Sequence, residues 1–291
     1  MALTVSTDRT AELLTKLEEL VVDLTASEPW MAFLKAVARF HNYSPNNVLL
    51  ILAQKPGATR CAGFNTWRSA FGRTVRKGER AIYVLGPCTR RIKEEDHDGG
   101  ERTTIRLTGF KSVATFDISQ TDGEPLPEIV HPLLGSAPPE LFAALVAFAE
   151  ANDYRVEVVD QQHLGAANGR CIPGPRLIEI SRDLSPLMAV KTAIHECSHL
   201  VLHSDELGAA DFDRPLAELE AESVAYVVMQ SIVCDGEALQ SATYSVGYIA
   251  HWSGGGTEAI AGLRVSADRI SATARKILDS LSDADASEVP S

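Results

Sequence analysis

Hydrophobic residues in the first 57 positions recur with helical spacing. Residues 13–24 place leucine and valine with a period near 3.6, which predicts a helix capped by Thr7 or Asp8. A second helix is predicted from about Pro29 to His41. Ser44 and Pro45 are typical of the N-cap and first residue of a third helix, which residues 55–57 (Lys-Pro-Gly) end.

After residue 57 the pattern changes to short extended runs. A helical turn around Trp67 precedes a run of branched and aromatic residues at 80–87, which predicts a strand. Segments 90–96 and 102–110 flank the turn HDGG and predict a hairpin, and a further strand is predicted over 113–118. Helices followed by strands indicate an α+β domain over residues 1–125.

A proline-rich stretch predicts a linker at residues 126–136, because proline removes backbone donors and few regular hydrogen bonds can form there. The second domain, residues 137–291, is predicted to hold a helix over 141–151 and strands over 155–159 and 176–181. Ser185 and Pro186 open the next helix. Further helices are predicted over 215–233, 241–252 and 258–281, the last after three glycines.

Composition limits the class of protein. The chain has 291 residues, of which 45% are hydrophobic and 23% charged, as in soluble globular proteins. No apolar run approaches the roughly 18 residues that cross a bilayer, and no secretory signal is visible, so a cytoplasmic protein without a membrane partner is expected. Five widely spaced cysteines without a C-x-x-C pair argue against a disulfide framework and a cysteine-based zinc site.

Charge is unevenly distributed along the chain. The net charge is −12, yet residues 1–125 carry 17 Lys and Arg against 15 Asp and Glu, so the remainder carries −14. Residues 55–93 contain ten bases and the single acid Glu79. Aromatic residues are interleaved with these bases, a combination that grips single-stranded DNA through phosphates and stacked bases. The alternative is a solvated basic face. Candidate DNA contacts, chosen by charge and aromaticity, are Trp67, Arg68, Arg73, Arg76, Lys77 and Arg80.

The segment TAIHECSHLVLH, residues 192–203, contains the pattern H-E-x-x-H on a predicted helix. A separation of four residues brings His195 and His199 onto one helix face, where both imidazoles can bind one Zn²⁺ ion. Glu196 can reach a water bound to that ion and act as its general base. The motif predicts a zinc metallopeptidase site with Glu196 as the catalytic residue.

A catalytic zinc ion needs a third protein ligand. Glu218 and Glu222 form an i, i+4 pair on a second helix, and the alternative is that these carboxylates lie on a solvated face, as Glu220 is expected to do. By resemblance to thermolysin-like zincins, Glu218 would bind the metal and Glu222 would orient His195 or His199, or the two would exchange roles. His203 continues the histidine series but lies about 6 Å further along the axis, so a supporting or structural role is expected.

Two more features bear on catalysis. The strand at 176–181 precedes the motif helix and is expected to hold an extended peptide substrate by its edge. Tyr244, Tyr248 and His251 stand at i, i+4 and i+7 and are candidate oxyanion donors, although such a stripe is more often simply core.

Three segments carry a resemblance to a known family: YSPNNVLLILAQKP, GFNTWRSAFGRTVRKGERAIYVLGP and FDISQTDGEPLP. Followed by a linker and the H-E-x-x-H helix, they resemble the ArdC-type antirestriction proteins of conjugative plasmids and phages. This resemblance implies an N-terminal domain that binds single-stranded DNA, joined to a zincin-like metallopeptidase domain, and a role in protecting incoming DNA from restriction. The second half is also similar to the ImmA/IrrE group, through HExxHxxxH at 195–203 and ExxA at 218–221.

Two alternatives remain from the sequence. One is a regulatory zinc endopeptidase that cleaves a repressor or a DNA-processing protein and uses its first domain for targeting. The other is a non-catalytic protein that coats single-stranded DNA and whose zinc ion stabilises the fold.

Overall fold

The computed structural model describes residues 4–24, 27–40, 42–95, 101–126, 139–206, 212–232 and 257–286. Contacts divide the chain into two compact units. Unit 1 comprises residues 1–23 and 46–127, and unit 2 comprises residues 24–45 and 128–291. Residues 24–45 thus pack with the later part of the chain. The predicted domain boundary after residue 125 stays a prediction, and residues 127–136 of the expected linker lie outside the described part.

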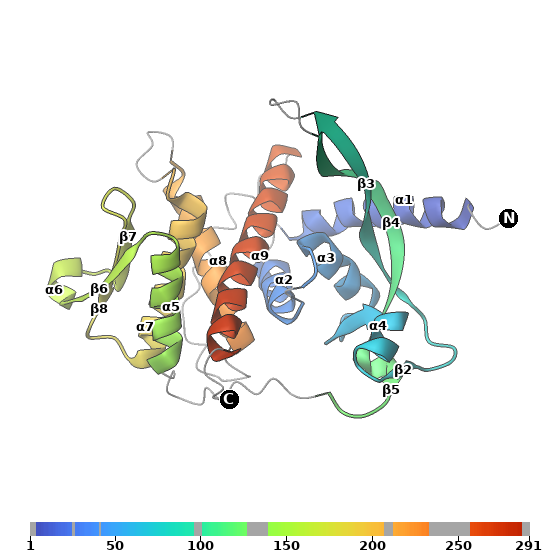
Figure 1. Ribbon diagram of the computed structural model, residues 1–291, viewed down its shortest axis with the longest axis horizontal. Helices are drawn as coiled ribbons and strands as arrows, with labels where there is room; N and C mark the ends of the chain where they lie inside the picture. The colour runs from blue at the N-terminus through green and yellow to red at the C-terminus, as the bar shows by residue number, and fades with distance from the viewer. Residues whose placement is uncertain are drawn as a thin grey trace. The chain divides into compact units, whose positions relative to one another are not determined.

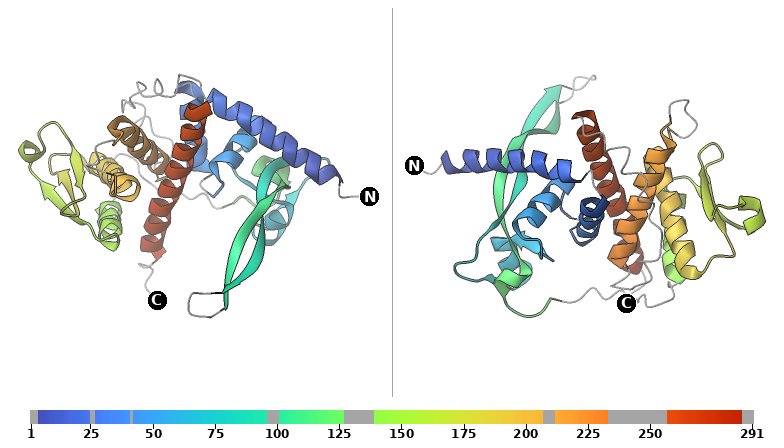
Figure 2. Two further views of the ribbon diagram at one scale, coloured as in Figure 1. Left: turned by 90° about the horizontal axis from the view of Figure 1, so that it is seen from above. Right: turned by 180° about the vertical axis from the view of Figure 1, so that it is seen from behind.

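Unit 1 is built around a long β-hairpin. Helices α1 (Thr4–Asp23), α3 (Pro45–Gln54) and α4 (Phe64–Ser69) accompany strands β1 (Cys61–Gly63), β3 (Ile82–Glu95) and β4 (Glu101–Asp117), which pair antiparallel in the order β1-β4-β3. A second pair joins β2 (Thr74–Val75) to β5 (Thr121–Asp122), and a 3-10 turn, η1 (Ile118–Gln120), precedes β5. Helix α1 lies across the hairpin, which extends beyond it as a two-stranded ribbon (Figures 1 and 2).

The hairpin is longer than the sequence predicts. Two expected strands merge into β3 and two into β4, because a bulge between Cys88 and Thr89 keeps both strands paired. Gly109, opposite Cys88, has a φ of 151°. A residue with a side chain would be strained in this backbone conformation. Leu13, Leu17, Leu50 and Leu85 form a buried cluster under α1, with Tyr83 packed against it.

Unit 2 places helices around a small mixed sheet. Strand β8 (Leu177–Ser181) is central, with β6 (Arg155–Val159) parallel on one side and β7 (Gly169–Ile172) antiparallel on the other. Helices α5 (Pro139–Ala151), α7 (Pro186–His203), α8 (Arg214–Ile232) and α9 (Thr257–Ala286) pack together, α2 (Ser27–Arg39) packs against α8, and α6 spans Gln161–Leu164. Helices and strands in both units confirm the α+β class.

Strand β7 is the main element that the sequence analysis did not predict. It holds only four residues, one of them glycine, and sequence propensity therefore indicated a turn. Among the helices of the described residues, none is long and apolar enough to cross a membrane.

Candidate metal centre

Helix α7 brings the motif residues to the surface of α8. Ser185 caps the helix by accepting a hydrogen bond from the Met188 backbone N–H, and Pro186 supplies its first residue. The apolar side of α7, which includes Ile194 and Leu200, is buried. This packing holds His195 and His199 against α8, the helix that carries the three glutamates.

Three ligand atoms meet at one point. His195 Nε2 and His199 Nε2 lie 3.1 Å apart. Glu218 Oε2 lies 3.4 Å from His195 Nε2 and 3.6 Å from His199 Nε2. Tetrahedral coordination with bonds of about 2.0–2.1 Å separates neighbouring ligands by roughly 3.3 Å. The three side chains therefore fit a divalent metal ion, and they form a metal-compatible group of His and carboxylate donors.

Glu222 and Lys191 support the first histidine. Glu222 Oε2 lies 3.2 Å from His195 Nδ1, on the ring edge away from the ligand atoms, and Glu222 Oε1 accepts a 2.8 Å hydrogen bond from Lys191 Nζ. A carboxylate at the second nitrogen sets the tautomer and direction of a ligand imidazole. Glu218 thus faces the ligand triangle while Glu222 faces the back of His195.

The electrostatics of this point favour a cation. Burial alone would lower the pKa of His195, but hydrogen bonds with Glu218 and Glu222 and the nearby charge of Glu196 raise it to about 10. The neighbouring imidazoles of His195 and His199 lower the pKa of Glu218. The carboxylates therefore stabilise positive charge between them, which a bound divalent ion would also supply.

Glu196 lies beside the triangle without belonging to it. Its side chain is buried, and burial raises its pKa to about 7, with the charge of Glu218 adding to the rise and His195 and the Cys171 backbone N–H opposing it. A general base is most useful with a pKa near the working pH. Strand β7 approaches closely here, because a Cβ on Gly169 would lie 2.7 Å from Thr192 Cγ2 and 3.2 Å from Glu196 Cγ.

A pocket of about 470 Å³ opens over these residues. It is lined by β7 residues 169–171, by Met188, Lys191 and the motif residues of α7, and by Phe212, Arg214, Glu218 and Glu222. The expectation that strand 176–181 offers its edge to a substrate is wrong, because β8 is paired on both sides. In the described part of the sheet, β7 is the edge strand that reaches the pocket.

His203 and Glu220 form a buried extension of the centre. His203 Nδ1 lies 3.1 Å from His199 Nδ1, and His203 Nε2 lies 3.0 Å from Glu220 Oε2. The expectation that Glu220 is solvated is wrong, since it is only 1% exposed. A residue two positions from Glu218 faces the opposite side of the helix, and here that side packs against α9. The predicted oxyanion donors Tyr244, Tyr248 and His251 lie outside the described residues.

Two of the expected DNA contacts have structural roles instead. Trp67 is fully buried, and its indole N–H donates to the Phe116 carbonyl. Arg73 is 8% exposed, and its guanidinium donates to Thr121 and to the carbonyls of Gly123 and Glu124. Neither side chain is available to DNA in this structure, because the indole is buried and the guanidinium donates its hydrogen bonds within unit 1.

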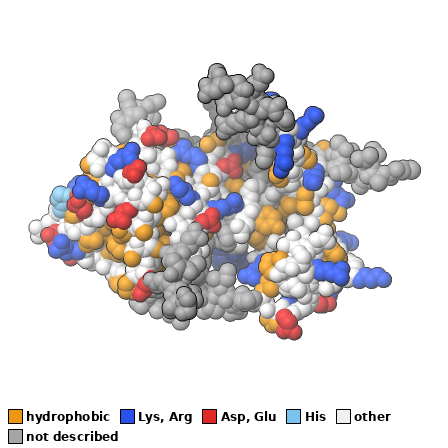
Figure 3. All heavy atoms as spheres, viewed as in Figure 1, with side chains coloured by type: hydrophobic (Ala, Val, Ile, Leu, Met, Phe, Trp, Pro, Cys, Tyr) orange, Lys and Arg blue, Asp and Glu red, His pale blue; other side chains and the backbone are white. Residues whose placement is uncertain are grey.

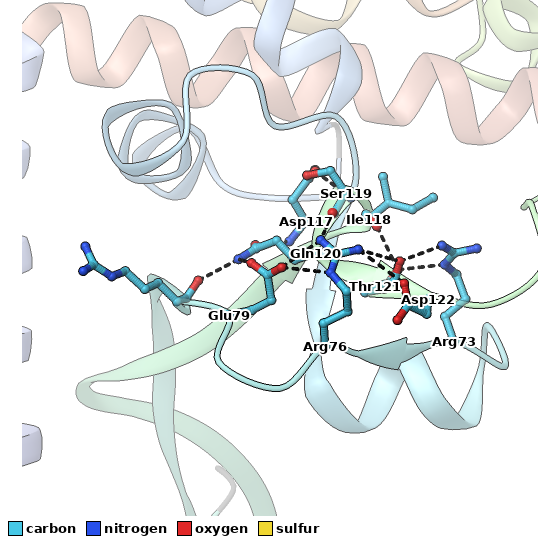
Figure 4. A network of polar contacts seen from close by, with 10 residues as sticks. Arg73, Arg76, Glu79, Asp117, Ile118, Ser119, Gln120, Thr121 and Asp122 are labelled. Carbon is cyan, nitrogen blue, oxygen red and sulfur yellow. Dashed lines mark hydrogen bonds and ion pairs between the residues drawn. The ribbon is translucent and has the colours of Figure 1, made fainter.

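Arg76 belongs to a network of hydrogen bonds and ion pairs that connects the basic segment, residues 55–93, to η1 and β5 (Figure 4). It is 41% exposed and pairs with Glu79 at 2.7 Å and with Asp122 at 3.4 Å. Gln120 donates to both Glu79 and the Arg80 carbonyl. Arg68, Lys77 and Arg80 are exposed side chains, so these three remain accessible to a ligand.

Three aromatic rings outside the list of candidate DNA contacts are exposed in unit 1. Phe64, the first residue of α4, is 50% exposed, Phe71, two residues after α4, is 38% exposed, and Phe110 on the hairpin is 48% exposed. Phe71 packs against Trp67 with ring centroids 5.1 Å apart. Figure 3 shows Lys and Arg side chains at the surface of unit 1. These rings differ from Trp67 in their burial, and residue type alone does not predict which aromatic residue is buried.

The fold and the site define an α+β protein with a candidate divalent-metal centre on an H-E-x-x-H helix. Residues 4–116 match the sequence family described as the N-terminal domain of anti-restriction factor ArdC. The N-terminal region of the chain is therefore similar to the N-terminal domain of the ArdC proteins, and this match covers residues 4–116 alone.

The individual relatives described next have low sequence identity to this chain. A protein of Bacillus anthracis described as uncharacterized is 27% identical over 282 residues, which cover 83% of this chain and 46% of that protein. The chain thus spans about half the length of this curated relative. Crystal structures of the antirestriction ArdC protein from plasmid R388 were also matched. The metal-free form has 23% identity, a TM-score of 0.49 and coverage of 84% of this chain and 86% of that chain. The Mn(II)-bound form has 20% identity, a TM-score of 0.47 and coverage of 85% and 86%.

Proposed function

We propose that this chain is an antirestriction protein that binds single-stranded DNA through unit 1 and carries a zinc metallopeptidase-type site in unit 2. The observation that supports the second part best is the triangle of His195, His199 and Glu218 ligand atoms with Glu196 beside it. The match of residues 4–116 to the N-terminal domain of anti-restriction factor ArdC supports the antirestriction role.

In the proposed site, His195, His199 and Glu218 would hold the zinc ion, and the ion would supply Lewis acidity toward a peptide carbonyl and a water molecule. Glu196 takes the proton of the attacking water and delivers it to the leaving amine. Its burial and its raised pKa, about 7, suit both steps, since the carboxyl group exchanges a proton readily near neutrality. Glu222 keeps His195 directed at the ion. The edge of β7 would align an extended peptide along the pocket.

The variant Glu196→Ala tests whether catalysis is used. It removes the base and no ligand, so zinc content and folding should be retained. Protection of conjugated DNA from restriction, and cleavage of a protein substrate, are measured in parallel. Glu157→Ala, on the exposed side of β6, is the matched control. Loss of protection in Glu196→Ala alone supports the proposal. Unchanged protection would instead favour a protein that coats DNA and whose metal is structural.

The DNA interface is proposed to lie around α4. Phe64 and Phe71 offer exposed rings for base stacking, and Arg68, Lys77 and Arg80 offer charges for phosphates. This arrangement favours single strands, because stacking on a side chain requires an unpaired base.

The interface is tested with the full chain and labelled oligonucleotides. Replacing both Phe64 and Phe71 by alanine is expected to weaken binding to single strands by at least 10-fold, at roughly 1–3 kcal/mol per stacked base. Phe110→Ala is the matched control, because its ring is similarly exposed on the hairpin. A larger loss for Phe110→Ala would move the interface to the hairpin, and equal affinity for duplex and single strands would contradict the assignment.

A further inference from the structure

Glu220 is a buried carboxylate with three polar side chains around it. Its Oε1 accepts a 2.6 Å hydrogen bond from Ser266 Oγ, and its Oε2 lies 3.0 Å from His203 Nε2 and 3.4 Å from Arg269 Nε. Arg269 is itself fixed by donating to the Leu202 carbonyl at 2.7 Å. Burying a carboxylate costs desolvation free energy. Either the neighbouring polar groups offset this cost, or the carboxylate has a function that justifies it.

The contacts extend from Glu220 to the metal centre through His203. A carboxylate accepts hydrogen bonds only, so His203 Nε2 must carry the proton and donate to Glu220. In a neutral His203, Nδ1 is then the acceptor, and His199 Nδ1, 3.1 Å away, is the donor. With its proton on Nδ1, His199 presents the lone pair of Nε2 to the ligand triangle. The hydrogen bonds between His199, His203 and Glu220 are therefore all satisfied when each imidazole donates toward Glu220.

We infer that Glu220 and His203 are positioning residues that set the tautomer and ring direction of His199 for metal binding. This inference rests on the proposed metal site. It makes the two histidine ligands unequal in their support, since His195 is held directly by Glu222, whereas His199 is held by Glu220 through an intervening imidazole. Because Ser266 and Arg269 belong to α9, the last described helix takes part in shaping the centre.

A purely structural role for Glu220 makes a different prediction. Glu220 would then join α7, α8 and α9, and its replacement would lower stability without a specific effect on metal affinity. A supporting hydrogen bond to a ligand histidine typically changes metal affinity by about 10–100-fold. Metal affinity measured beside stability therefore separates the two roles.

The first experiment compares Glu220→Gln with Glu206→Gln in the full chain. Glu206 also contacts Arg269, at 3.7 Å, but is 54% exposed and lies outside the series, which makes it a matched control. Zn²⁺ affinity is measured by competition with a chromogenic chelator, and unfolding of the metal-free proteins is measured alongside. We expect Glu220→Gln to bind Zn²⁺ about 10-fold more weakly or worse, and the control to bind normally. Equal affinities of the two variants would overturn the inference and leave the metal site standing.

The second experiment is a double-mutant cycle with His203→Phe, which keeps a ring beside Phe212 but removes both nitrogens. If Glu220 acts through His203, Glu220→Gln changes Zn²⁺ affinity less than about 2-fold in the His203→Phe background. The same loss in both backgrounds would overturn the inference. Ser266→Ala is a milder variant that keeps the inference testable if Glu220→Gln does not fold, and it should weaken Zn²⁺ binding in the same direction.

A third measurement needs no metal. Long-range proton–nitrogen NMR correlations on the metal-free chain should show the proton of His199 on Nδ1 and that of His203 on Nε2. The opposite tautomer of either residue would overturn the inference. Failure of the unsubstituted chain to bind Zn²⁺ would instead remove the metal site itself, so the two failures are distinguishable.

Discussion

The metal centre of unit 2 and the basic segment of unit 1 are both clusters of charged residues, but they use charge differently. In the centre, carboxylates of α8 face imidazoles of α7 and leave a point at which positive charge is stabilised. In the basic segment, Arg73 and Arg76 donate to carbonyls and carboxylates of the same unit. The geometry of the first cluster suits a bound cation. Many contacts of the second cluster instead stabilise the fold of unit 1.

The comparison is tested most strongly by removing a proposed ligand. His195→Ala should lower Zn²⁺ affinity by more than the roughly 100-fold upper range seen for supporting residues, because it removes a donor atom. Chelator competition measures the effect. His163→Ala is the control, since this histidine is half exposed and pairs with Glu179 away from the ligand triangle. Equal Zn²⁺ affinity of the two variants would show that the centre resembles the basic segment in having a structural role only.

Trp67→Ala should have a large effect on stability and none that is specific to DNA. Emptying a fully buried indole site costs about 3–5 kcal/mol, and the free energy of unfolding by urea measures it. Phe64→Ala, on the same short helix but half exposed, should cost far less. If Trp67→Ala unfolded normally yet lost DNA binding, the assignment of Trp67 to the core would fail.

Asp117 gives a prediction about pH. Burial alone would raise its pKa, but hydrogen bonds from Ser119, Thr59 and Arg60 outweigh burial and hold the pKa below its usual range. A lowered pKa in the folded state contributes stability above the unfolded pKa, near 4, and this contribution is lost as pH falls through the folded value.

The wild type should therefore lose stability below about pH 4, and Asp117→Asn should show a smaller decrease over that range because it removes the titrating group. At pH 7 the substitution should cost about 1–3 kcal/mol. Urea unfolding at a series of pH values measures both effects. Asp122→Asn is the control, because its carboxylate is 72% exposed. Identical pH dependence of the Asp117 variant and the wild type would contradict the stabilising role of the hydrogen bonds to this carboxylate.

The smallest effects are expected for single exposed bases. Arg68→Ala, Lys77→Ala and Arg80→Ala should each weaken binding of single-stranded DNA a few-fold, reduce the salt dependence by about one counterion, and leave stability within about 0.5 kcal/mol. Fluorescence titrations at several salt concentrations measure these changes. Salt dependence that is unchanged in all three variants would exclude this face from the interface.

The two regions also show what a single sequence can and cannot predict. The i, i+4 spacing of His195 and His199 fixes their geometry within one helix, and the same holds for Glu218 and Glu222. Local periodicity therefore predicted that each pair shares a helix face, whereas the expectation that the two helices meet came from the resemblance to thermolysin-like zincins. Trp67 and Arg73 were chosen by residue type, and their burial depends on β4 and β5, which lie more than 40 positions away. Glu220 was misjudged for the same reason, because its partners on α9 are distant in sequence.

Strand β7 adds a marker that the H-E-x-x-H pattern lacks. A side chain larger than hydrogen at position 169 would meet the Glu179 carbonyl oxygen at 2.9 Å, and a backbone atom cannot rotate away as a side chain can. Chains that keep the histidines and glutamates but replace this glycine would have to displace the strand, and with it the amide that holds the base. We therefore expect related chains with the same placement of this strand beside the motif helix to keep a glycine about 26 positions before the first motif histidine.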